Sequence, residues 1–432
     1  MPGKQYNREV EYRRRVIDEE LDELMVGLAA VALEGPRGVG KTATASRRAD
    51  SLFELDDPNQ REVLAADPAQ IDAIEGTVLI DEWQRHPPIW DYVRRRVDAG
   101  AAPGRFLLTG SSAPAENPAH SGAGRIVRLR MRPLCLAERG LADPTVSLGR
   151  LLSGERPAVA GSTEVGISAY VEEILASGFP DIRRLSGRLR RAQLDSYLAR
   201  VVERDFPDQG LRVRRPDALR AWLAAYAAAT ATTASYNTLL DAATPGETEK
   251  PSKPTSIAYR DVLSQLWLLD PVPGWLPGRG HLRRLTQAPK HHLADPALAA
   301  HLLGVDAGAL LHGQAAGPDI PRDGSLLGAL FESLVTLSVR VYAQANEASV
   351  HHLRTRDGDH EVDLIVQRRD QRAVAFEVKL AATAGPADVR HLLWLREQLG
   401  DDLLDAAVVT TGTHAYRRPD GIAVIPAALL GV

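Results

Sequence analysis

The sequence contains a single cysteine, Cys135, among its 432 residues. One thiol excludes an intramolecular disulfide and a zinc or iron–sulfur cluster built from several thiolates. The sequence also has no large excess of charge of one sign, because the formal net charge is only −4. The whole chain therefore exerts no strong pull on nucleic acid, and any DNA-binding site has to be a local basic patch.

Long apolar runs are scarce as well. The N-terminal stretch MPGKQYNREVEYRRRV has no apolar core of the kind found in signal peptides. No stretch is predicted to reach the length that a membrane span requires. We therefore expect a cytoplasmic protein with no membrane partner. The chain length suggests about three domains.

A glycine-rich segment follows the first apolar run, Ala29 to Leu33, and precedes a helix-compatible run, 43–49. Small residues let backbone N–H groups curl around a phosphate, and the helix that follows presents its positive end to the same group. This order predicts a P-loop, in which Lys41 reaches the β and γ phosphates and Thr42 offers its hydroxyl to Mg²⁺. The predicted nucleotide-binding residues are Gly35, Pro36, Arg37, Gly38, Val39, Gly40, Lys41 and Thr42.

Two later strands are predicted to supply the remaining groups for hydrolysis. Residues 77–83 are a β-prone run ending in Asp81 and Glu82. Asp81 is expected to hold Mg²⁺ through water, and Glu82 to polarise the attacking water. Residues 105–112 end in hydroxyls, so Thr109 or Ser111 would sense the γ-phosphate. The alternatives are an ordinary strand with a charged exit and a polar turn after a strand.

Strands alternate with helical patterns through the first third of the chain, which predicts a doubly wound parallel α/β sheet. Arg125 lies at a loop–strand junction and is a candidate for the arginine that stabilises charge during phosphoryl transfer, or else a surface arginine. If Arg125 acts across subunits, a homo-oligomer is required. The arginines within residues 12–17 are expected to form a solvated face, or to touch nucleotide or a neighbouring subunit.

The segments GPRGVGKT, VLIDEWQ, FLLTGSS and GRIVRLRMRPLCLAE occur in this order. Together they resemble the AAA-type P-loop ATPases of bacteria and archaea that carry an uncharacterised C-terminal half. The resemblance covers roughly the first third of the chain and implies ATP, Mg²⁺ and a P-loop near the centre of the sheet. Cys135 stands where that family often has a small polar residue. We place this domain at residues 1–150, followed by a connection over 142–168.

Residues 165–305 are predicted to form a helical domain with a winged-helix pattern, similar to the middle region of the same family. Helices are expected over 189–206, 216–232, 235–240 and 257–268, and a β-wing over 267–273 and 285–295. Such a unit binds DNA or protein. The basic runs 212–215, 283–284 and 290–292 are candidate DNA contacts or solvated faces. His291 and His292 are adjacent, point different ways and make a poor metal pair.

The last region, 320–432, reads as helix, three strands, helix and two strands. Asp363 followed by Glu377, Val378 and Lys379 resembles the PD-(D/E)XK nuclease fold, and Glu332 matches the acid on that fold's first helix. The carboxylates of Glu332, Asp363 and Glu377 would hold Mg²⁺ or Mn²⁺, and Lys379 would stabilise charge on phosphorus oxygens. A salt-bridged Glu–Lys pair on an ordinary strand is the alternative.

The sequence thus predicts an ATPase that uses Mg²⁺ and is coupled to a nuclease-like domain acting on DNA. The alternative is an ATP-dependent DNA- or protein-binding switch whose nuclease-like module does not cleave. A small-molecule kinase is a weaker reading, because no acceptor site is evident and two domains are left without a role.

Overall fold

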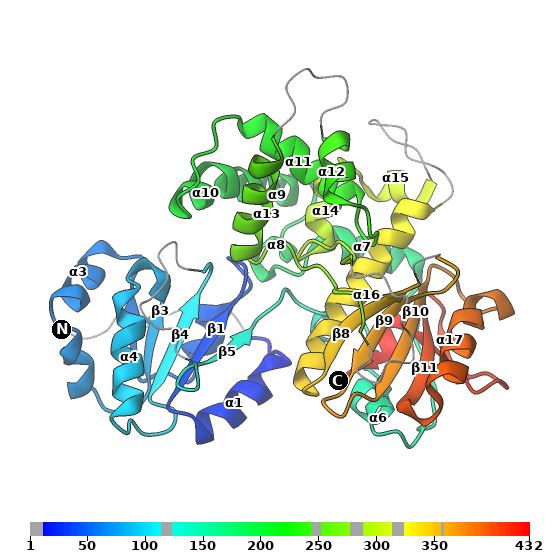
Figure 1. Cartoon of the computed structure of the whole chain (residues 1–432), viewed down its shortest axis with the longest axis horizontal. Helices are drawn as coiled ribbons and strands as arrows, with labels where there is room; N and C mark the ends of the chain where they lie inside the picture. Colours follow the sequence, from blue (N-terminus) through cyan, green and yellow to red (C-terminus); the bar gives the residue numbers. More distant parts are fainter. Residues whose placement is uncertain (1–11, 114–122, 244–251, 277–287, 313–323, 356–357) are drawn as a thin grey trace.

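The computed structural model describes residues 12–113, 123–243, 252–276, 288–312, 324–355 and 358–432. Three domains are arranged around the long helix α16 (Ser325–Ala345) (Figure 1). The N-terminal domain lies on one side of α16, the C-terminal sheet lies on the other, and a helical middle domain covers one end of both.

The N-terminal domain is built on a five-stranded sheet in which every paired strand is parallel, in the order β2-β3-β4-β1-β5. Alternate residues of its strands enter two separate apolar cores, one on each face. The short apolar runs in β1, β3 and β4 suit a parallel sheet that is covered on both sides. The strands are β1 (Ala30–Glu34), β2 (Ser51–Glu54), β3 (Val78–Asp81), β4 (Phe106–Gly110) and β5 (Val127–Arg130).

The doubly wound prediction agrees with this arrangement. The P-loop was expected near the centre of the sheet, and β1 is an interior strand that lies between the central strand β4 and the edge strand β5. The helical segments of this domain are α1 (Ile17–Gly27), α2 (Lys41–Ala45), α3 (Pro58–Ala66), η1 (Pro68–Ala73), η2 (Trp83–Arg85), α4 (Pro88–Asp98) and α5 (Leu136–Arg139).

The middle domain is helical. The predicted long helix over 189–206 is interrupted, since α9 ends at Arg200 and passes through a π-helical turn, η3, into α10. The helices are α7 (Ile167–Ala176), α8 (Pro180–Arg183), α9 (Gly187–Arg200), η3 (Val201–Asp205), α10 (Phe206–Asp208), α11 (Pro216–Ala228), α12 (Tyr236–Ala242), α13 (Lys253–Gln265), α14 (Pro296–Leu302) and α15 (Ala307–His312).

Residues 268–275 and 288–294 form a short antiparallel pair, which we call the ribbon. Two bridges hold it, Leu269 to Leu293 and Val272 to Lys290. The ribbon occupies the place of the predicted β-wing, of which residues 285–287 lie outside the described residues. A further bridge from Gly274 to His352 joins the ribbon to the C-terminal domain.

The C-terminal domain contains a seven-stranded sheet in the order β7-β12-β13-β11-β10-β9-β8. The predicted succession of helix, strands and helix is present, and β10 has the predicted bounds. The elements are β8 (Ser349–Arg354), β9 (Glu361–Gln367), β10 (Ala373–Lys379), α17 (Pro386–Leu399), η4 (Gly400–Asp402), β11 (Leu403–Thr410), β12 (His414–Arg417), β13 (Ala423–Pro426), η5 (Ala427–Leu429) and β14 (Leu430–Gly431).

The connection between the first two domains is part of the C-terminal fold. It contains β6 (Val146–Ser147), α6 (Leu148–Leu152) and β7 (Gly161–Ser162). β7 pairs with β12, and β6 pairs with β14. The predicted boundary at residue 150 therefore falls inside a segment, 146–162, whose strands pair with the C-terminal domain.

One described helix, α16, is long and apolar enough to cross a membrane, contrary to the expectation from the sequence. Its most apolar window is 67% buried inside the fold. Leu136 N and Ala137 N donate to Ser338 Oγ and Tyr342 OH of this helix at 3.1 and 3.0 Å. These contacts identify α16 as the core helix on which the domains pack.

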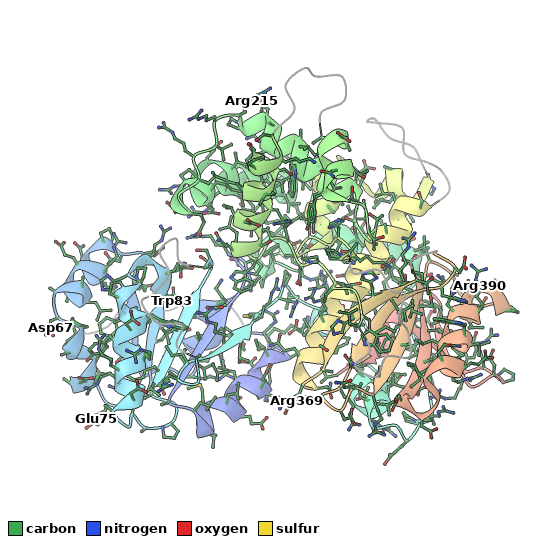
Figure 2. All side chains as sticks on the ribbon, in the orientation of Figure 1. Asp67, Glu75, Trp83, Arg215, Arg369 and Arg390 are labelled. Carbon is green, nitrogen blue, oxygen red and sulfur yellow. The ribbon has the colours of Figure 1, made fainter. Side chains whose placement is uncertain are left out.

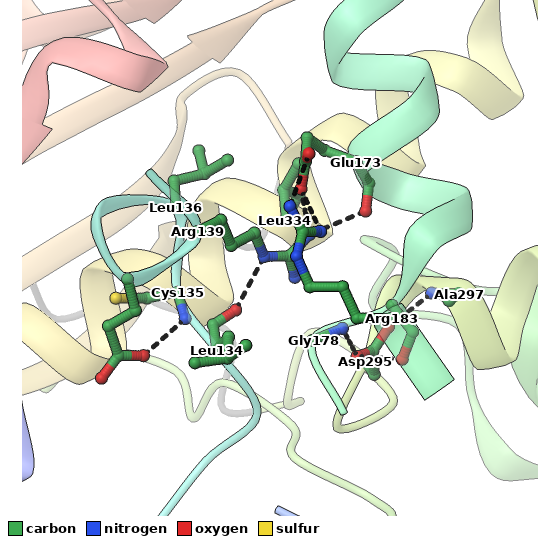
Figure 3. A network of polar contacts seen from close by, with 12 residues as sticks. Leu134, Cys135, Leu136, Arg139, Glu173, Gly178, Arg183, Asp295, Ala297 and Leu334 are labelled. Carbon is green, nitrogen blue, oxygen red and sulfur yellow. Dashed lines mark hydrogen bonds and ion pairs between the residues drawn. The ribbon is translucent and has the colours of Figure 1, made fainter. Parts of the chain in front are cut away.

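An arginine network fastens the end of the N-terminal domain to the middle domain (Figure 3). Arg139 donates to Leu134 O at 2.9 Å and pairs with Glu173 of α7 at 3.1 Å. Arg183 of α8 pairs with the same carboxylate at 2.5 Å. Asp295, just before α14, accepts from Gly178 N at 2.5 Å. Buried charges are tolerated when paired in this way.

A second buried carboxylate, Asp270 of the ribbon, joins all three domains. It pairs with Arg130 of β5 at 3.0 Å, with Arg132 at 2.8 Å and with Arg340 of α16 at 2.9 Å. Although burial opposes ionisation, these three guanidinium groups hold the pKa of Asp270 well below its usual range. Asp270 is therefore a charged hub at the junction.

We expect Asp270→Ala to lower the free energy of unfolding by about 3–5 kcal/mol, because three buried guanidinium groups lose their shared carboxylate. Thermal unfolding followed by circular dichroism measures the change. Glu19→Ala removes an exposed partner of Arg14 and is the control, with an expected change within about 0.5 kcal/mol. Equal melting temperatures for the two variants would contradict the role given to Asp270.

Candidate functional site

The glycine-rich turn after β1 has the backbone that a phosphate-binding loop requires. Gly40 has φ 101°, a region that residues with a Cβ rarely adopt. Any Cβ on Gly35 would overlap the carbonyl oxygen of Met131, which follows β5. Lys41 Nζ donates to Gly35 O and Pro36 O at 2.9 Å each. The ammonium group thus lies inside the loop, where it faces an incoming phosphate.

Burial governs the charge of this lysine. The Lys41 side chain is almost completely buried, and burial lowers its pKa to about 8, with Glu82 and Asp81 opposing the shift. A phosphate group would add negative charge beside the ammonium and raise the pKa again. Nucleotide binding above pH 8 should therefore be accompanied by protonation of Lys41.

The predicted magnesium residues lie together at the carboxyl ends of β1 and β3. Thr42 Oγ1 donates to Asp81 Oδ1 at 2.8 Å, and the Thr109 hydroxyl donates to the same oxygen. A hydroxyl and a carboxylate are the oxygen ligands that Mg²⁺ prefers. Thr42 and Asp81 fit that ion, which would supply charge neutralisation for the β and γ phosphates.

Glu82 is held in a strained backbone conformation next to this pair. Its φ is 55°, in the left-handed region, which for a non-glycine residue is a feature of functional sites. Its Oε2 accepts from Ser111 Oγ at 2.6 Å and from the Gln84 amide. The two hydroxyls expected to sense phosphate thus divide their roles, since Thr109 contacts Asp81 and Ser111 contacts Glu82.

A cavity of about 70 Å³ lies beside the Glu82 network, between the N-terminal and middle domains. It is lined by both domains, including Arg37, Gln84 and Ser111 from the first and Tyr197, Asp205 and Gln209 from the second. Gln209 Nε2 donates to Ser112 Oγ at 3.1 Å, and Tyr197 OH donates to Arg37 O at 3.3 Å. The middle domain therefore covers the edge of the P-loop.

Arg15 is a site residue that the sequence did not reveal. Its side chain is buried, where Nη1 donates to Val39 O of the P-loop at 2.9 Å and Nε donates to Glu138 Oε1 at 2.9 Å. Nη2 donates to Arg132 O at 2.9 Å. Within a peptide group the C=O and N–H point in opposite directions, so holding Val39 O on Arg15 directs Gly40 N–H the other way. A solvated face was the expectation, and for Arg15 it is wrong.

Arg125 is not brought to this site. It pairs with Asp98 at the end of α4 at 2.7 Å, and it precedes β5, at the amino edge of the sheet opposite the P-loop. Within one chain it therefore does not contact the site, and its role as an arginine acting across subunits stays a prediction.

The acids predicted in the C-terminal domain do come together, around a lysine from the middle domain. Lys290 of the ribbon is 1% exposed. Its Nζ lies 2.9 Å from Glu332 Oε1, 2.9 Å from Asp363 Oδ1 and 3.3 Å from Glu361 Oε1. We call these three carboxylates with Glu377 the acidic cluster. Lys290 belongs to a basic run that was expected either to contact DNA or to form a solvated face, and its burial contradicts both expectations.

The strand residues have the predicted arrangement. Lys379 Nζ pairs with Glu377 Oε2 at 3.0 Å, and Val378 N donates to Asp363 Oδ2 at 2.9 Å. Burial and the charge of Asp363 raise the pKa of Glu332 to about 8 and that of Glu377 well above its usual range. Although burial opposes it, Lys290 and Lys379 hold the pKa of Asp363 well below its usual value.

These carboxylates do not fit a divalent cation in this arrangement. Within the described residues, no group of three or more His, Cys, Asp or Glu side chains is placed to hold a metal ion. The Lys290 ammonium occupies the space between Glu332 and Asp363, where the predicted ion would bind. The metal-binding role predicted for Glu332, Asp363 and Glu377 is therefore not supported by the geometry.

The two histidines after Lys290, which were expected not to be ligands, are buried. His291 Nε2 lies 2.8 Å from Ala234 O, and burial lowers the pKa of His292 to about 3. The second basic run, Arg283 and Arg284, lies outside the described residues. The exposed run Arg212 to Arg215 lies at the outer end of the middle domain, as the position of Arg215 shows (Figure 2).

Comparison with known families agrees with the first of these sites. The model of an AAA domain family matches residues 29–139. The N-terminal third of the chain is thus a P-loop domain of the ATPase type. Two domains of unknown function match the remainder, DUF8612 over residues 167–309 and DUF4143 over residues 327–430.

Similar proteins are known in mycobacteria. Uncharacterised proteins of Mycobacterium bovis and Mycobacterium tuberculosis are each 27% identical to this chain over 408 residues, which is 92% of this chain and 80% of theirs. Among solved structures, a Walker-type ATPase of Pyrococcus abyssi is 16% identical in sequence, with a TM-score of 0.40. The superposition includes 68% of this chain and 97% of the Pyrococcus chain.

We expect nucleotide binding at pH 8.5 to take up a proton, because Lys41 is largely neutral in the free protein above its pKa of about 8. Calorimetric titration with ADP in two buffers of different ionisation enthalpy measures this uptake. At pH 6.5, Lys41 is already protonated and contributes none. Lys41→Arg is the control that keeps the charge. Equal uptake by this variant and the wild type at pH 8.5 would contradict the assignment.

We expect Arg15→Ala to weaken ATP binding about tenfold or more, because the P-loop loses a charged hydrogen bond to Val39 O. Binding of a fluorescent ATP analogue measures the affinity. Arg14→Ala is the matched control, since Arg14 is exposed and pairs only with Glu19 among the described salt bridges. Unchanged affinity in a folded Arg15→Ala variant would rule out the proposed positioning role.

Proposed function

We propose that this protein is an ATP-hydrolysing switch that engages DNA through its middle domain and carries a nuclease-like module that does not cleave. The observation that carries the ATPase part is the convergence of Lys41, Thr42, Asp81 and Glu82 at one edge of the sheet. Each group supports one requirement of phosphoryl transfer.

The chain's own residues support hydrolysis in the following way. The P-loop N–H groups and Lys41 bind the phosphates, and Thr42 and Asp81 hold Mg²⁺. Glu82 accepts a hydrogen bond from the attacking water and receives its proton as the water attacks the γ-phosphorus. Ser111 and Gln84 donate to Glu82 and fix its direction. The middle domain contributes Tyr197, Asp205 and Gln209 to the wall of the cavity beside this edge.

The DNA part rests on the middle domain. Helices α11, α12 and α13 are followed by the antiparallel ribbon, which is the element order of a winged helix. In that arrangement the third helix enters the major groove. Trp222 of α11 packs on α13, where its Nε1 donates to Ser256 Oγ at 2.8 Å. Lys253 lies exposed in the first turn of α13, next to any phosphate that this helix would meet.

The non-cleaving part rests on Lys290. An internal ammonium neutralises the acidic cluster and leaves no room for the cation that a nuclease of this kind would use. A nuclease acting on DNA was the leading interpretation of the sequence. The geometry favours the alternative, in which the module has a nuclease-like arrangement of residues without cleavage.

We expect Lys41→Ala and Glu82→Gln to reduce ATP turnover by about 10²-fold or more, because one removes phosphate binding and the other removes the base. Phosphate release measured with a coupled assay reports the rate. Asp363→Ala alters the other site and should retain ATP turnover. Wild-type turnover by a folded Lys41→Ala variant would exclude the assigned nucleotide site.

We expect the wild-type protein without nucleotide, where Lys290 occupies the acidic cluster, to leave plasmid and single-stranded DNA intact with Mg²⁺ or Mn²⁺. We also expect it to raise the fluorescence anisotropy of a labelled DNA duplex. Gel electrophoresis checks cleavage, and Glu377→Ala is the control for contaminating nuclease. Cleavage by the wild type that Glu377→Ala abolishes would overturn the non-cleaving module and restore the nuclease interpretation.

A further inference from the structure

We propose that the ribbon is a nucleotide-dependent lock: Lys290 is inserted in the acidic cluster when the P-loop is free of nucleotide, and it leaves the cluster when ATP binds. This inference rests on the proposed ATPase function and adds the regulation of the C-terminal module. Three sets of contacts carry it, one at each end of the ribbon and one between them.

The first set is the insertion of Lys290 itself. The lysine belongs to the middle domain, but its ammonium is almost completely buried among carboxylates of α16 and β9. A lysine that only needed a partner could have paired at the surface with far less desolvation. Its ammonium therefore occupies the space between Glu332 and Asp363.

The second set joins the two ends of the ribbon into one rigid unit. Val272 N donates to Lys290 O and Lys290 N donates to Val272 O, each at 2.9 Å. Asp270 N donates to His292 O at 2.9 Å. Because these backbone bonds link neighbouring positions on the two strands, a shift of Asp270 also moves Lys290.

The third set ties Asp270 to the P-loop. Its partners Arg130 and Arg132 flank Met131, whose carbonyl oxygen packs against Gly35 and whose N–H donates to Glu34 O at 2.7 Å. At the other end of the loop, Arg15 bridges Val39 O and Arg132 O at 2.9 Å each. Gly35 therefore contacts the segment that holds Asp270 directly, and Val39 is linked to this segment through Arg15.

Helix α16 is the element that the ribbon contacts on both of its strands, and the ribbon would move relative to it. Arg340 Nη1 donates to Asp270 O and Pro271 O at 2.9 Å, and Glu332 binds Lys290 two helical turns earlier. Sliding of the ribbon along α16 would break both sets of contacts together. The two arrangements required for a switch are thus the ribbon seated on α16 and the ribbon displaced from it.

Lysine labelling tests this lock without any variant. The sequence has six lysines, Lys4, Lys41, Lys250, Lys253, Lys290 and Lys379. The full-length protein is treated with an amine-reactive acetylating reagent, with and without the β,γ-imido analogue of ATP and Mg²⁺, and each lysine is followed by mass spectrometry. We expect the analogue to raise the labelling rate of Lys290 about tenfold or more, while exposed Lys253 stays constant.

Lys41 reports nucleotide binding in the same samples. Protection of Lys41 with an unchanged rate at Lys290 would overturn the lock and leave the ATPase assignment standing. Failure of the analogue to protect Lys41 would overturn the ATPase assignment and the lock that rests on it.

A matched pair of variants tests the route through Asp270. Arg130→Gln removes one of the three partners of Asp270, whereas Arg128→Gln alters the same face of the same strand at an exposed side chain that approaches Glu34. We expect Arg130→Gln to protect Lys41 but to lose the gain at Lys290, and Arg128→Gln to keep both. An undiminished gain in Arg130→Gln would overturn transmission through this carboxylate.

Discussion

The buried carboxylate of Asp270 is the constraint on which the arrangement of the three domains depends. A charge removed from water is tolerated only with full pairing, and none of its arginine partners belongs to the ribbon. Two come from the segment beside the P-loop and one from α16. The ribbon therefore reaches a stable position only where both of these elements are already in place, which makes the junction between the domains specific.

The acidic cluster also depends on the pairing of buried charges, but here one cation lies among three carboxylates. Glu332, Glu361 and Asp363 lie close enough to repel one another, and burial would make several of them protonate without a cation. Metal-dependent enzymes meet this requirement with an ion from solution. Here an ammonium group from another domain meets it. The same residue pattern on α16, β9 and β10 is thus compatible with two outcomes, and the source of the cation decides between them.

Local features were accessible from the sequence because they depend on neighbours in the chain. The P-loop follows β1 as expected, Asp81 ends β3 with Glu82 directly after it, and β10 has its predicted bounds. Periodicity and turn residues report which face of an element is buried. Spacing alone also sufficed to bring Glu377 and Lys379 together, since residues two apart on a strand share a face.

Contacts between distant residues were not accessible. Lys290 and Asp363 are 73 residues apart in the sequence and belong to different domains. Arg15 and Glu138 are 123 residues apart and meet only when the N-terminal domain is complete. Each of these basic residues lies in a run that looks like a solvated face, because a sequence pattern shows charge but not the partner that compensates it. The strand β7 was not predicted either, because a segment of two residues has no periodicity.

The insertion of β6, α6 and β7 into the C-terminal fold has a consequence for biosynthesis. Residues 146–162 leave the ribosome long before β12 and β14, the strands with which they pair. Until the last residues of the chain emerge, this segment has apolar side chains, such as those of Leu148 and Leu151, without their final neighbours. The first domain can form early. The C-terminal domain is completed only when Val146 pairs with Leu430, which is made 284 residues later.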